Sequence, residues 1–407
     1  MSSDARYAII VGAGPAGLAA AELLGEAGWR VAIHERMPNP ARKFLLAGRG
    51  GLNLTHSEPL DAFLDRYGAA RARLEPAIRA FTPSDLRAWC EGLGVETFVG
   101  SSGRVFPKQM KASPLLRAWL ARLGALGVQL VPRSCWTGWE GEALVFETPE
   151  GVRRETPDAT IFALGGASWP RLGSDGSWRE AFVARGVRVT QLRPSNSGFR
   201  VDWSDVFRER FAGEPLKPAA FVFAGGFSNF NIRGEAIITR DGIEGGAIYA
   251  MSAALRDFIA KTGRAYLTID LAPHVAMDAL VERLGASPKT SMANRLRKAG
   301  LSPVAAGLVR EDHRDGGATL PVEAEHLAHR IKACTIKLTE TAGLERAIST
   351  AGGVSWDSVA ADFSLKADAR TFVAGEMLDW EAPTGGYLLQ ACFATGRAAA
   401  KGVLARG

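Results

Sequence analysis

Several features that define other protein classes are scarce or missing in this sequence. Its 407 residues include only four cysteines, Cys90, Cys135, Cys334 and Cys392, and no two of them form a Cys-x-x-Cys pair. The sequence therefore lacks the redox-active dithiol of disulfide reductases, and we expect free thiols in a reducing compartment. The first residues lack the basic and then apolar order of a signal peptide, so a cytoplasmic location is expected.

A long uncharged apolar run and a block of basic residues are also missing. The apolar stretch 9–29 contains Glu22, Glu26 and several glycines, so it does not fit a membrane-spanning helix. The formal net charge is +6, and the arginines are scattered along the chain. This pattern disfavours a nucleic-acid partner, whereas it suits a phosphate-bearing cofactor or an anionic substrate. The chain is long enough for two or three domains.

What the sequence does contain begins with a strand, a glycine-rich turn and a helix. Residues 7–11 are apolar and stop at Gly12, and residues 16–27 are rich in Ala and Leu. In the motif Gly12-x-Gly14-x-x-Gly17, the first glycine permits a tight turn and the second lets a pyrophosphate approach the backbone. The third lets the helix pack closely on the strand.

The residues around this motif indicate which ligand it serves. The N-terminus of the helix, at Pro15 and Ala16, offers backbone N–H groups and a positive dipole end to phosphates. Glu35 follows a second apolar run, where an acid accepts the ribose hydroxyls of FAD or NAD and repels the 2′-phosphate of NADP. The strand–turn–helix context favours dinucleotide binding over a glycine-rich turn in an unrelated α/β protein.

A second glycine-rich region lies near the other end of the chain. An apolar run ends at Gly375-Glu376, and Gly385-Gly386-Tyr387 then opens an Ala-rich helix. We expect this segment to close over the isoalloxazine, with backbone N–H groups near N1 and the C2 oxygen. The alternative is an ordinary α/β crossover with a glycine cap.

A third region, residues 42–55, places three glycines beside cations. This composition predicts backbone wrapped against an anionic or planar ligand, and the alternative is a flexible surface loop. Further along, short strands at 128–131, 143–146 and 152–155, with turns at Glu140-Gly141 and Glu150-Gly151, predict a meander at the edge of the first domain. The pattern of apolar segments changes again near residue 194, where strands of a mainly antiparallel unit are expected.

Together these motifs resemble the HI0933-like family of NAD(P)/FAD-dependent oxidoreductases, which are bacterial flavoproteins, over nearly the whole chain. The resemblance rests on the Gly12 motif, the Arg42-Lys43 to Asn53 loop, Gly103 to Pro107, Ala163 to Pro170, Gly173 to Gly176, Thr350 to Val354, Gly375 to Asp379 and Gly385 to Gln390. Two departures point to a divergent subgroup. Gly48-Arg49-Gly50-Gly51-Leu52-Asn53 replaces the common Gly-Gly-Gly-Arg-Cys-Asn, and Leu388 stands where Asn is usual.

The resemblance implies an α/β fold with a discontinuous FAD-binding domain. This domain, Rossmann-like, doubly wound and of the two-dinucleotide-binding flavoprotein type, is expected at 1–193 and 348–407. An inserted domain is expected at 194–347. It would have a β-barrel-like part at about 194–272 and 331–347 and a helical part at about 273–330.

The predicted activity is FAD-dependent oxidoreduction of a small-molecule substrate by hydride transfer through flavin N5. No second glycine motif follows an apolar strand, so NAD(P)H is a candidate reductant only as a transient partner of a non-covalently bound FAD. Two alternatives stay open, a flavin-dependent RNA-modifying protein and a non-catalytic FAD-binding sensor. No metal site is expected.

The predicted site consists of two sets of residues. The predicted cofactor-binding residues are Gly12, Gly14, Pro15, Ala16, Gly17, Glu35, Arg36, Lys43, Gly48, Gly50, Gly51, Asn53, Ala163, Leu164, Gly165, Gly375, Glu376, Gly385, Gly386, Tyr387 and Leu388. The candidates to face the substrate are Arg49, His56, Trp169 and Tyr387. Each of these has a purely structural alternative, such as phosphate neutralisation for Arg49 or packing for Trp169.

Overall fold

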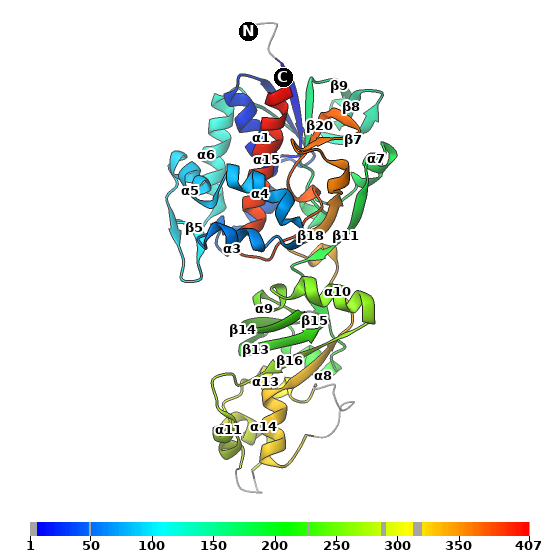
Figure 1. Ribbon diagram of the computed structural model, residues 1–407. Helices are drawn as coiled ribbons and strands as arrows, with labels where there is room; N and C mark the ends of the chain where they lie inside the picture. The colour runs from blue at the N-terminus through cyan, green and yellow to red at the C-terminus, as the bar shows by residue number, and fades with distance from the viewer. Residues whose placement is uncertain (1–5, 49, 227, 286–289, 312–319, 407) are drawn as a thin grey trace. The chain divides into compact units, whose positions relative to one another are not determined.

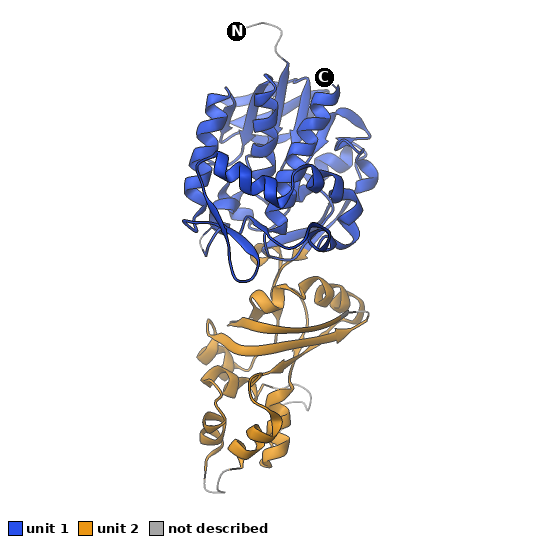
Figure 2. Cartoon of the chain, turned by 60° about the vertical axis from the view of Figure 1, so that its left-hand side comes forward, with its two compact units in different colours: residues 1–193, 348–407 blue, residues 194–347 orange. Residues whose placement is uncertain are grey.

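The computed structural model describes residues 6–406 except 49, 227, 286–289 and 312–319. The chain divides into two compact units, which are coloured separately in Figure 2. Unit 1 comprises residues 1–193 and 348–407, and unit 2 comprises residues 194–347. None of the helices in the described part combines the length and apolar character needed to cross a membrane.

Unit 1 is built on a six-stranded sheet in the order β19-β20-β10-β1-β2-β6. Its strands are β1 Tyr7–Val11, β2 Arg30–Glu35, β6 Gln129–Pro132, β10 Ala159–Phe162, β19 Ser364–Leu365 and β20 Asp368–Val373. β1 pairs in parallel with β2 and β10, and β20 adds in parallel to β10. Parallel strands at the centre of a sheet read as continuous apolar runs because both faces are covered.

Helices from both ends of the chain cover this sheet. The helices of unit 1 are α1 Pro15–Glu26, α2 Arg42–Ala47, α3 Leu60–Asp65, α4 Arg71–Ala80, α5 Pro83–Gly92, α6 Ala112–Ala125, α7 Arg179–Ala184 and α15 Tyr387–Arg406. α1 and α15 lie side by side although they are far apart in sequence (Figure 1). A Cβ on Gly396 would come within 2.1 Å of the carbonyl oxygen of Ala16, so glycine is required for this approach.

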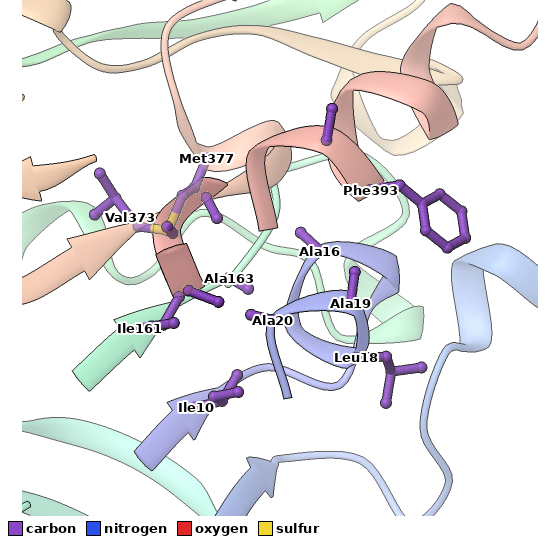
Figure 3. Packing of buried hydrophobic residues seen from close by; sticks show 14 of the residues in the cluster. Ile10, Ala16, Leu18, Ala19, Ala20, Ile161, Ala163, Val373, Met377 and Phe393 are labelled. Atoms are coloured by element: carbon purple, nitrogen blue, oxygen red, sulfur yellow. The ribbon is translucent and has the colours of Figure 1, made fainter. Parts of the chain in front are cut away.

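Small side chains of α1 pack against the apolar strands beneath it. Figure 3 shows Ala16, Ala19 and Ala20 of α1. They belong to the same buried cluster as Ile10 of β1 and Ile161 of β10. Each Å² of apolar surface buried by this packing stabilises the fold by roughly 25 cal/mol. The close packing also holds the start of α1 over the ends of the strands.

A buried carboxylate ties α1 to the helices beside it. Glu22 is 1% exposed and accepts hydrogen bonds from the indole N–H groups of Trp89 and Trp119, and it pairs with Arg122 at 2.9 Å. A buried carboxylate is tolerated when it is paired and hydrogen-bonded in this way. The glutamate that argues against a membrane span at 9–29 is therefore a structural contact of α1.

Smaller sheets complete unit 1. They are β3 Thr55–His56, β5 Arg104–Pro107 and β4 Thr97–Val99, then β7 Cys135–Glu140, β8 Ala143–Thr148 and β9 Gly151–Glu155, and β11 Val189–Ser195 with β18 Ser349–Val354. The meander consists of β7, β8 and β9. The expectation that residues 128–131 belong to it is wrong, because β6 pairs in parallel with β2 in the main sheet.

Unit 2 has its own antiparallel sheet, in the order β12-β15-β14-β13-β16-β17. Its strands are β12 Phe199–Arg200, β13 Pro215–Gly225, β14 Ser228–Thr239, β15 Gly242–Glu244, β16 Ala265–Asp270 and β17 Cys334–Leu338. Backbone hydrogen bonds join Arg200 to Thr339 and Glu340, just after β17, so the two edges of the sheet meet. This closure gives the sheet the predicted β-barrel-like character.

The helices of unit 2 pack around this sheet and around each other. They are α8 Asp205–Phe211, α9 Gly246–Tyr249, α10 Ser252–Thr262, α11 Met277–Leu284, α12 Met292–Lys298, α13 Pro303–Leu308 and α14 Ala324–Lys332. A separate hydrophobic core that includes Phe221, Leu267 and Ile336 holds the unit together. The predicted α/β class, with a Rossmann-like domain and an antiparallel insertion, is confirmed.

Candidate functional site

A cavity of about 510 Å³ lies in unit 1, where β1, β2 and β10 end. Its volume is within the range of small-molecule and cofactor sites, and ligands of open α/β sheets bind outside the carboxyl ends of the strands. Many predicted cofactor-binding residues line it, namely Gly12, Gly14, Pro15, Ala16, Glu35, Arg36, Lys43, Ala163, Leu164, Gly165, Gly375, Glu376 and Leu388.

The glycines of the first motif have three different surroundings. Gly12 has a φ of +105°, and a Cβ there would come within 2.5 Å of the carbonyl oxygen of Ala163. Gly17 does not line the cavity, because it packs the helix against the turn: its Cβ would lie 2.0 Å from the carbonyl oxygen of Gly12. Gly14 lines the cavity, and a Cβ there would meet nothing within 4 Å. The turn therefore leaves open space beside the first turn of α1.

The carboxylate of Glu35 is fixed at the end of β2. Its Oε2 accepts a hydrogen bond from the backbone N–H of Ala13 at 2.9 Å, and its Oε1 accepts one from Met37 at 2.8 Å. Burial raises the pKa of Glu35, and the two backbone N–H groups partly offset this effect. Each carboxylate oxygen has a second lone pair, so the group can still accept hydrogen bonds from a ligand hydroxyl.

A segment that the sequence did not assign to the site, residues 172–178, forms another wall of the cavity. Asp175 pairs with Arg36 at 2.7 Å and accepts hydrogen bonds from Ser177. Burial alone would raise the pKa of Asp175, but the bonds from Ser177 and Arg36 hold it below its usual value. A Cβ on Gly173 would meet Met37 at 2.8 Å, so this segment packs directly onto the end of β2.

Two predicted residues that are far apart in sequence, Lys43 and Glu376, form an ion pair in the cavity wall. The Nζ of Lys43 donates to Oε2 of Glu376 and to Oγ of Ser168, both at 2.8 Å. The other carboxylate oxygen of Glu376 accepts the backbone N–H of Thr350 at 3.0 Å. The side chains of Lys43 and Glu376 are 26% and 14% exposed. The ammonium group of Lys43 therefore faces the cavity while the carboxylate of Glu376 balances its charge.

The second glycine motif packs against protein. Gly385 and Gly386 do not line the cavity, and their φ values are +138° and +97°. A Cβ on Gly386 would come within 2.5 Å of the backbone of Thr55. Tyr387 does not line the cavity, whereas the next residue, Leu388, does. The start of α15 thus forms part of the wall, while Gly386 fits it against β3.

Gly48, Gly50, Gly51 and Asn53, in the loop after α2, do not line the cavity. Ala47 lines the cavity, and a Cβ on Gly48 would meet Ala112 at 2.6 Å. A Cβ on Gly51 would meet Met110, and one on Gly50 would meet nothing within 4 Å. The Oδ1 of Asn53 is buried without a hydrogen-bond partner in the described part of the chain.

Of the four candidate substrate-facing residues, the three that the structure describes do not line the cavity. Arg49 lies outside the described residues. Trp169 is 38% exposed with a φ of +59°, and it does not line the cavity. His56 and Tyr387 stack with their ring centroids 5.6 Å apart, but neither lines the cavity.

Several lining residues were missed from the sequence. They are Val11, His34, Asn39, Ala41, Arg42, Phe44, Ala47, Ser134, Cys135, Trp136, Thr137, Leu172, Gly173, Ser174, Asp175, Ser177, Trp178, Ala181, Ile348, Ser349, Leu389 and Cys392. The block from Gly173 to Gly176 was a usable signal, because it belongs to the family resemblance. Burial raises the pKa of the Cys392 thiol to about 12, so this cysteine stays protonated at neutral pH. No cluster of metal-binding side chains occurs among the described residues.

Comparisons with known proteins agree with this architecture. Residues 6–402 match the family described as HI0933-like protein Rossmann domain. A curated relative, the 3-dehydro-bile acid delta(4,6)-reductase of Clostridium scindens, is 26% identical over 416 residues and covers 98% of both chains.

Two solved structures of steroid enzymes are also similar. The 3-ketosteroid delta1-dehydrogenase of Sterolibacterium denitrificans matches with a TM-score of 0.53 and 12% identity, covering 98% of this chain and 99% of that one. The 3-ketosteroid-delta4-(5alpha)-dehydrogenase of Rhodococcus jostii matches with a TM-score of 0.46 and 14% identity, covering 100% and 98%. At such low identity, the first of these likenesses shows a shared fold and no more.

Proposed function

The chain belongs to the HI0933-like family of flavin-dependent oxidoreductases, and from this membership we propose that its cavity holds FAD non-covalently for the reduction of a small molecule. The family prediction made from the motifs is thereby confirmed. The observation that carries the proposal is the open space at Gly14. It lies beside the N-terminus of α1, where backbone N–H groups bind phosphate.

The residues around the cavity fit FAD as follows. Gly12, Gly14 and the first turn of α1 would hold the pyrophosphate, and Glu35 would accept the ribose hydroxyls. Lys43 supplies a positive charge that Glu376 and Ser168 hold in place. Leu388 and Leu389 form the wall beside the start of α15, where the isoalloxazine is expected.

Other residues of the predicted set would act by packing. Gly17 brings α1 onto the turn, Gly385 and Gly386 seat α15, and Gly48 seats the loop after α2 on α6. When bound, FAD supplies two-electron chemistry through N5 of its ring, which is how we propose that hydride is transferred. None of the four cysteines forms a disulfide in the structure, and no two of them form a Cys-x-x-Cys pair, so we propose no second redox centre.

The substrate is proposed from the curated relative reported above, which is similar over 98% of its length. That protein is named as a reductase of a 3-dehydro-bile acid at its delta(4,6) positions. We therefore propose that this chain reduces a carbon–carbon double bond of an apolar unsaturated ketone. NADH or NADPH would bind transiently as the reductant, since no second glycine motif is available to hold it.

An anaerobic absorption experiment tests the proposal. The purified protein is expected to show flavin bands that bleach on addition of NADH or NADPH and return when a cyclic unsaturated ketone is added. Protein without flavin bands, even after incubation with FAD, would refute the cofactor assignment.

Other outcomes of the same experiment decide between the alternatives. Flavin that stays oxidised with both nucleotides, and shows no turnover on any unsaturated acceptor, would favour a sensor. Binding of transfer RNA at physiological salt would instead favour the RNA-modifying alternative.

A further inference from the structure

Four titratable side chains meet beside the start of α15, outside the cavity. This group, the Glu58 cluster, consists of His56, Glu58, Arg66 and Tyr387. The guanidinium of Arg66 donates from Nε and Nη2 to the two oxygens of Glu58, at 3.2 and 2.7 Å. The phenol of Tyr387 donates to Oε1 of Glu58. One carboxylate therefore joins an arginine after α3 to the first residue of α15.

His56 supports this arrangement with both ring nitrogens. Its Nδ1 accepts the backbone N–H of Glu58 at 3.1 Å, and its Nε2 lies 3.0 Å from the carbonyl oxygen of Ser102. These contacts fit a neutral ring with the proton on Nε2. The ring also stacks on Tyr387, so His56 helps to place both partners of the phenol–carboxylate bond.

Tyr387 is held at two points. Besides its phenol, its backbone carbonyl accepts a hydrogen bond from the hydroxyl of the buried Tyr67 at 2.8 Å. The residue before it, Gly386, rests on the backbone of Thr55. The residues directly after it, Leu388 and Leu389, line the cavity. Residues 55–67 thus fix the position of a cavity wall that they do not form themselves.

We propose that Glu58 and Tyr387 are positioning residues for the proposed FAD site: through their hydrogen bond they set the place of Leu388 and Leu389 in the cavity wall. This inference rests on the proposed function. Glu58 and Tyr387 are not proposed as catalytic residues, because neither lines the cavity. The sequence prediction of Tyr387 as a substrate-facing residue thereby receives a different role.

The charges of the cluster support a structural bond that persists at neutral pH. Burial alone would raise the pKa of Glu58, but the hydrogen bonds from Arg66 and Tyr387 hold it below its usual value. Burial and the Glu58 carboxylate both raise the pKa of Tyr387. The phenol is therefore a persistent donor and the carboxylate a persistent acceptor, which is what an anchor requires.

A double-mutant cycle on the FAD-loaded protein tests the proposal. Tyr387→Phe and Glu58→Ala should each speed FAD release about tenfold and shift the flavin absorption band, because each frees the start of α15. The double variant should be no worse than the poorer single variant, since both changes remove the same bond. Glu58→Gln keeps an acceptor for the phenol and should restore slow release.

Two controls separate this role from general destabilisation. Glu96→Ala breaks the exposed pair with Lys108 in the same unit and should leave both FAD release and the absorption band unchanged. The melting temperature of each FAD-free variant shows whether the fold itself has weakened. Faster release that follows the loss in melting temperature, with no change in the absorption band, would overturn the proposal.

Failure of this proposal can be told from failure of the proposed function. If the wild-type protein binds no FAD, the cofactor site itself is wrong. If the wild-type protein binds FAD, but Tyr387→Phe and Glu58→Ala release it at the wild-type rate or additively, the positioning role is refuted while the FAD site stands.

Discussion

Gly14 and Gly386 both belong to glycine-rich turns that lead into a long helix of unit 1. Gly14 lines the cavity and a Cβ there would meet no protein atom within 4 Å, whereas a Cβ on Gly386 would meet the backbone of Thr55 at 2.5 Å. The first glycine leaves space beside α1 that we propose the pyrophosphate of FAD fills. The second lets two parts of the protein touch. If the proposal is right, similar turns serve ligand binding in one case and packing in the other.

Gly14→Val should have the largest effect on FAD binding. The valine side chain would occupy the space proposed for the pyrophosphate, so we expect at least a roughly hundredfold loss of FAD affinity, or about 2.7 kcal/mol. The FAD-free protein should melt near the wild-type temperature, because a Cβ at this position meets no protein atom within 4 Å. Flavin content after gel filtration and thermal melting measure the two effects.

The matched control for this variant is Gly124→Val. Gly124 lies on the exposed side of α6, and a Cβ there also meets nothing within 4 Å. This variant should keep its flavin. If Gly14→Val purifies with full flavin occupancy, the cofactor is not where we place it.

Gly386→Ala should give the opposite pattern. The added Cβ would press on the backbone of Thr55 at a φ of +97°, so the free energy of unfolding should fall by about 1–3 kcal/mol. Urea unfolding of the FAD-free protein measures this loss, and FAD affinity should weaken only as a consequence. A variant that loses FAD while its unfolding curve stays unchanged would show that Gly386 faces the ligand after all.

The smallest expected effect is on the ion pair between Asp175 and Arg36 in the cavity wall. Asp175→Asn removes the charge that pairs with Arg36, and because both side chains are about one-third exposed we expect a loss of only about 0.5 kcal/mol at pH 7. The pKa of Asp175 is lowered in the folded protein. Its contribution is therefore present above its unfolded pKa of about 3.9 and fades as the pH falls through the lower folded value.

Unfolding curves of the wild-type protein and Asp175→Asn should accordingly converge between about pH 4 and pH 2. Asp205→Asn in unit 2 is a suitable control, because Asp205 is paired with Arg208 but is 88% exposed. A difference for Asp175→Asn that stays constant over this range would mean that its charge does not contribute to stability.

The sequence predicted the parts of this architecture that are governed by local chemistry. Gly12, Gly14 and Gly17 appear in a short stretch where strand, turn and helix each have a clear pattern, and Glu35 follows at the end of the next strand. The family and the Rossmann-like fold were predicted correctly on this basis.

The rest of the site depends on contacts between distant residues. Nothing near Lys43 shows that its partner is Glu376, and nothing near Tyr387 identifies Glu58, which lies 329 residues away. Likewise, glycines at 385 and 386 look the same in the sequence whether a ligand or Thr55 lies against them. Such distinctions come from the folded arrangement, because they depend on which surface each residue meets.

The split composition of unit 1 has a consequence for how the protein is made. Strand β20 and helix α15, which complete the sheet and the cavity wall, lie in the part of unit 1 that is synthesised after residues 194–347. At roughly 5–20 residues per second, the ribosome spends roughly 8 to 30 seconds on that insertion. During this interval the edge of β10 that later pairs with β20 is unpaired, and the cavity lacks the wall that α15 contributes. An unpaired strand edge promotes aggregation, so the nascent chain is vulnerable until its C-terminal part has been made.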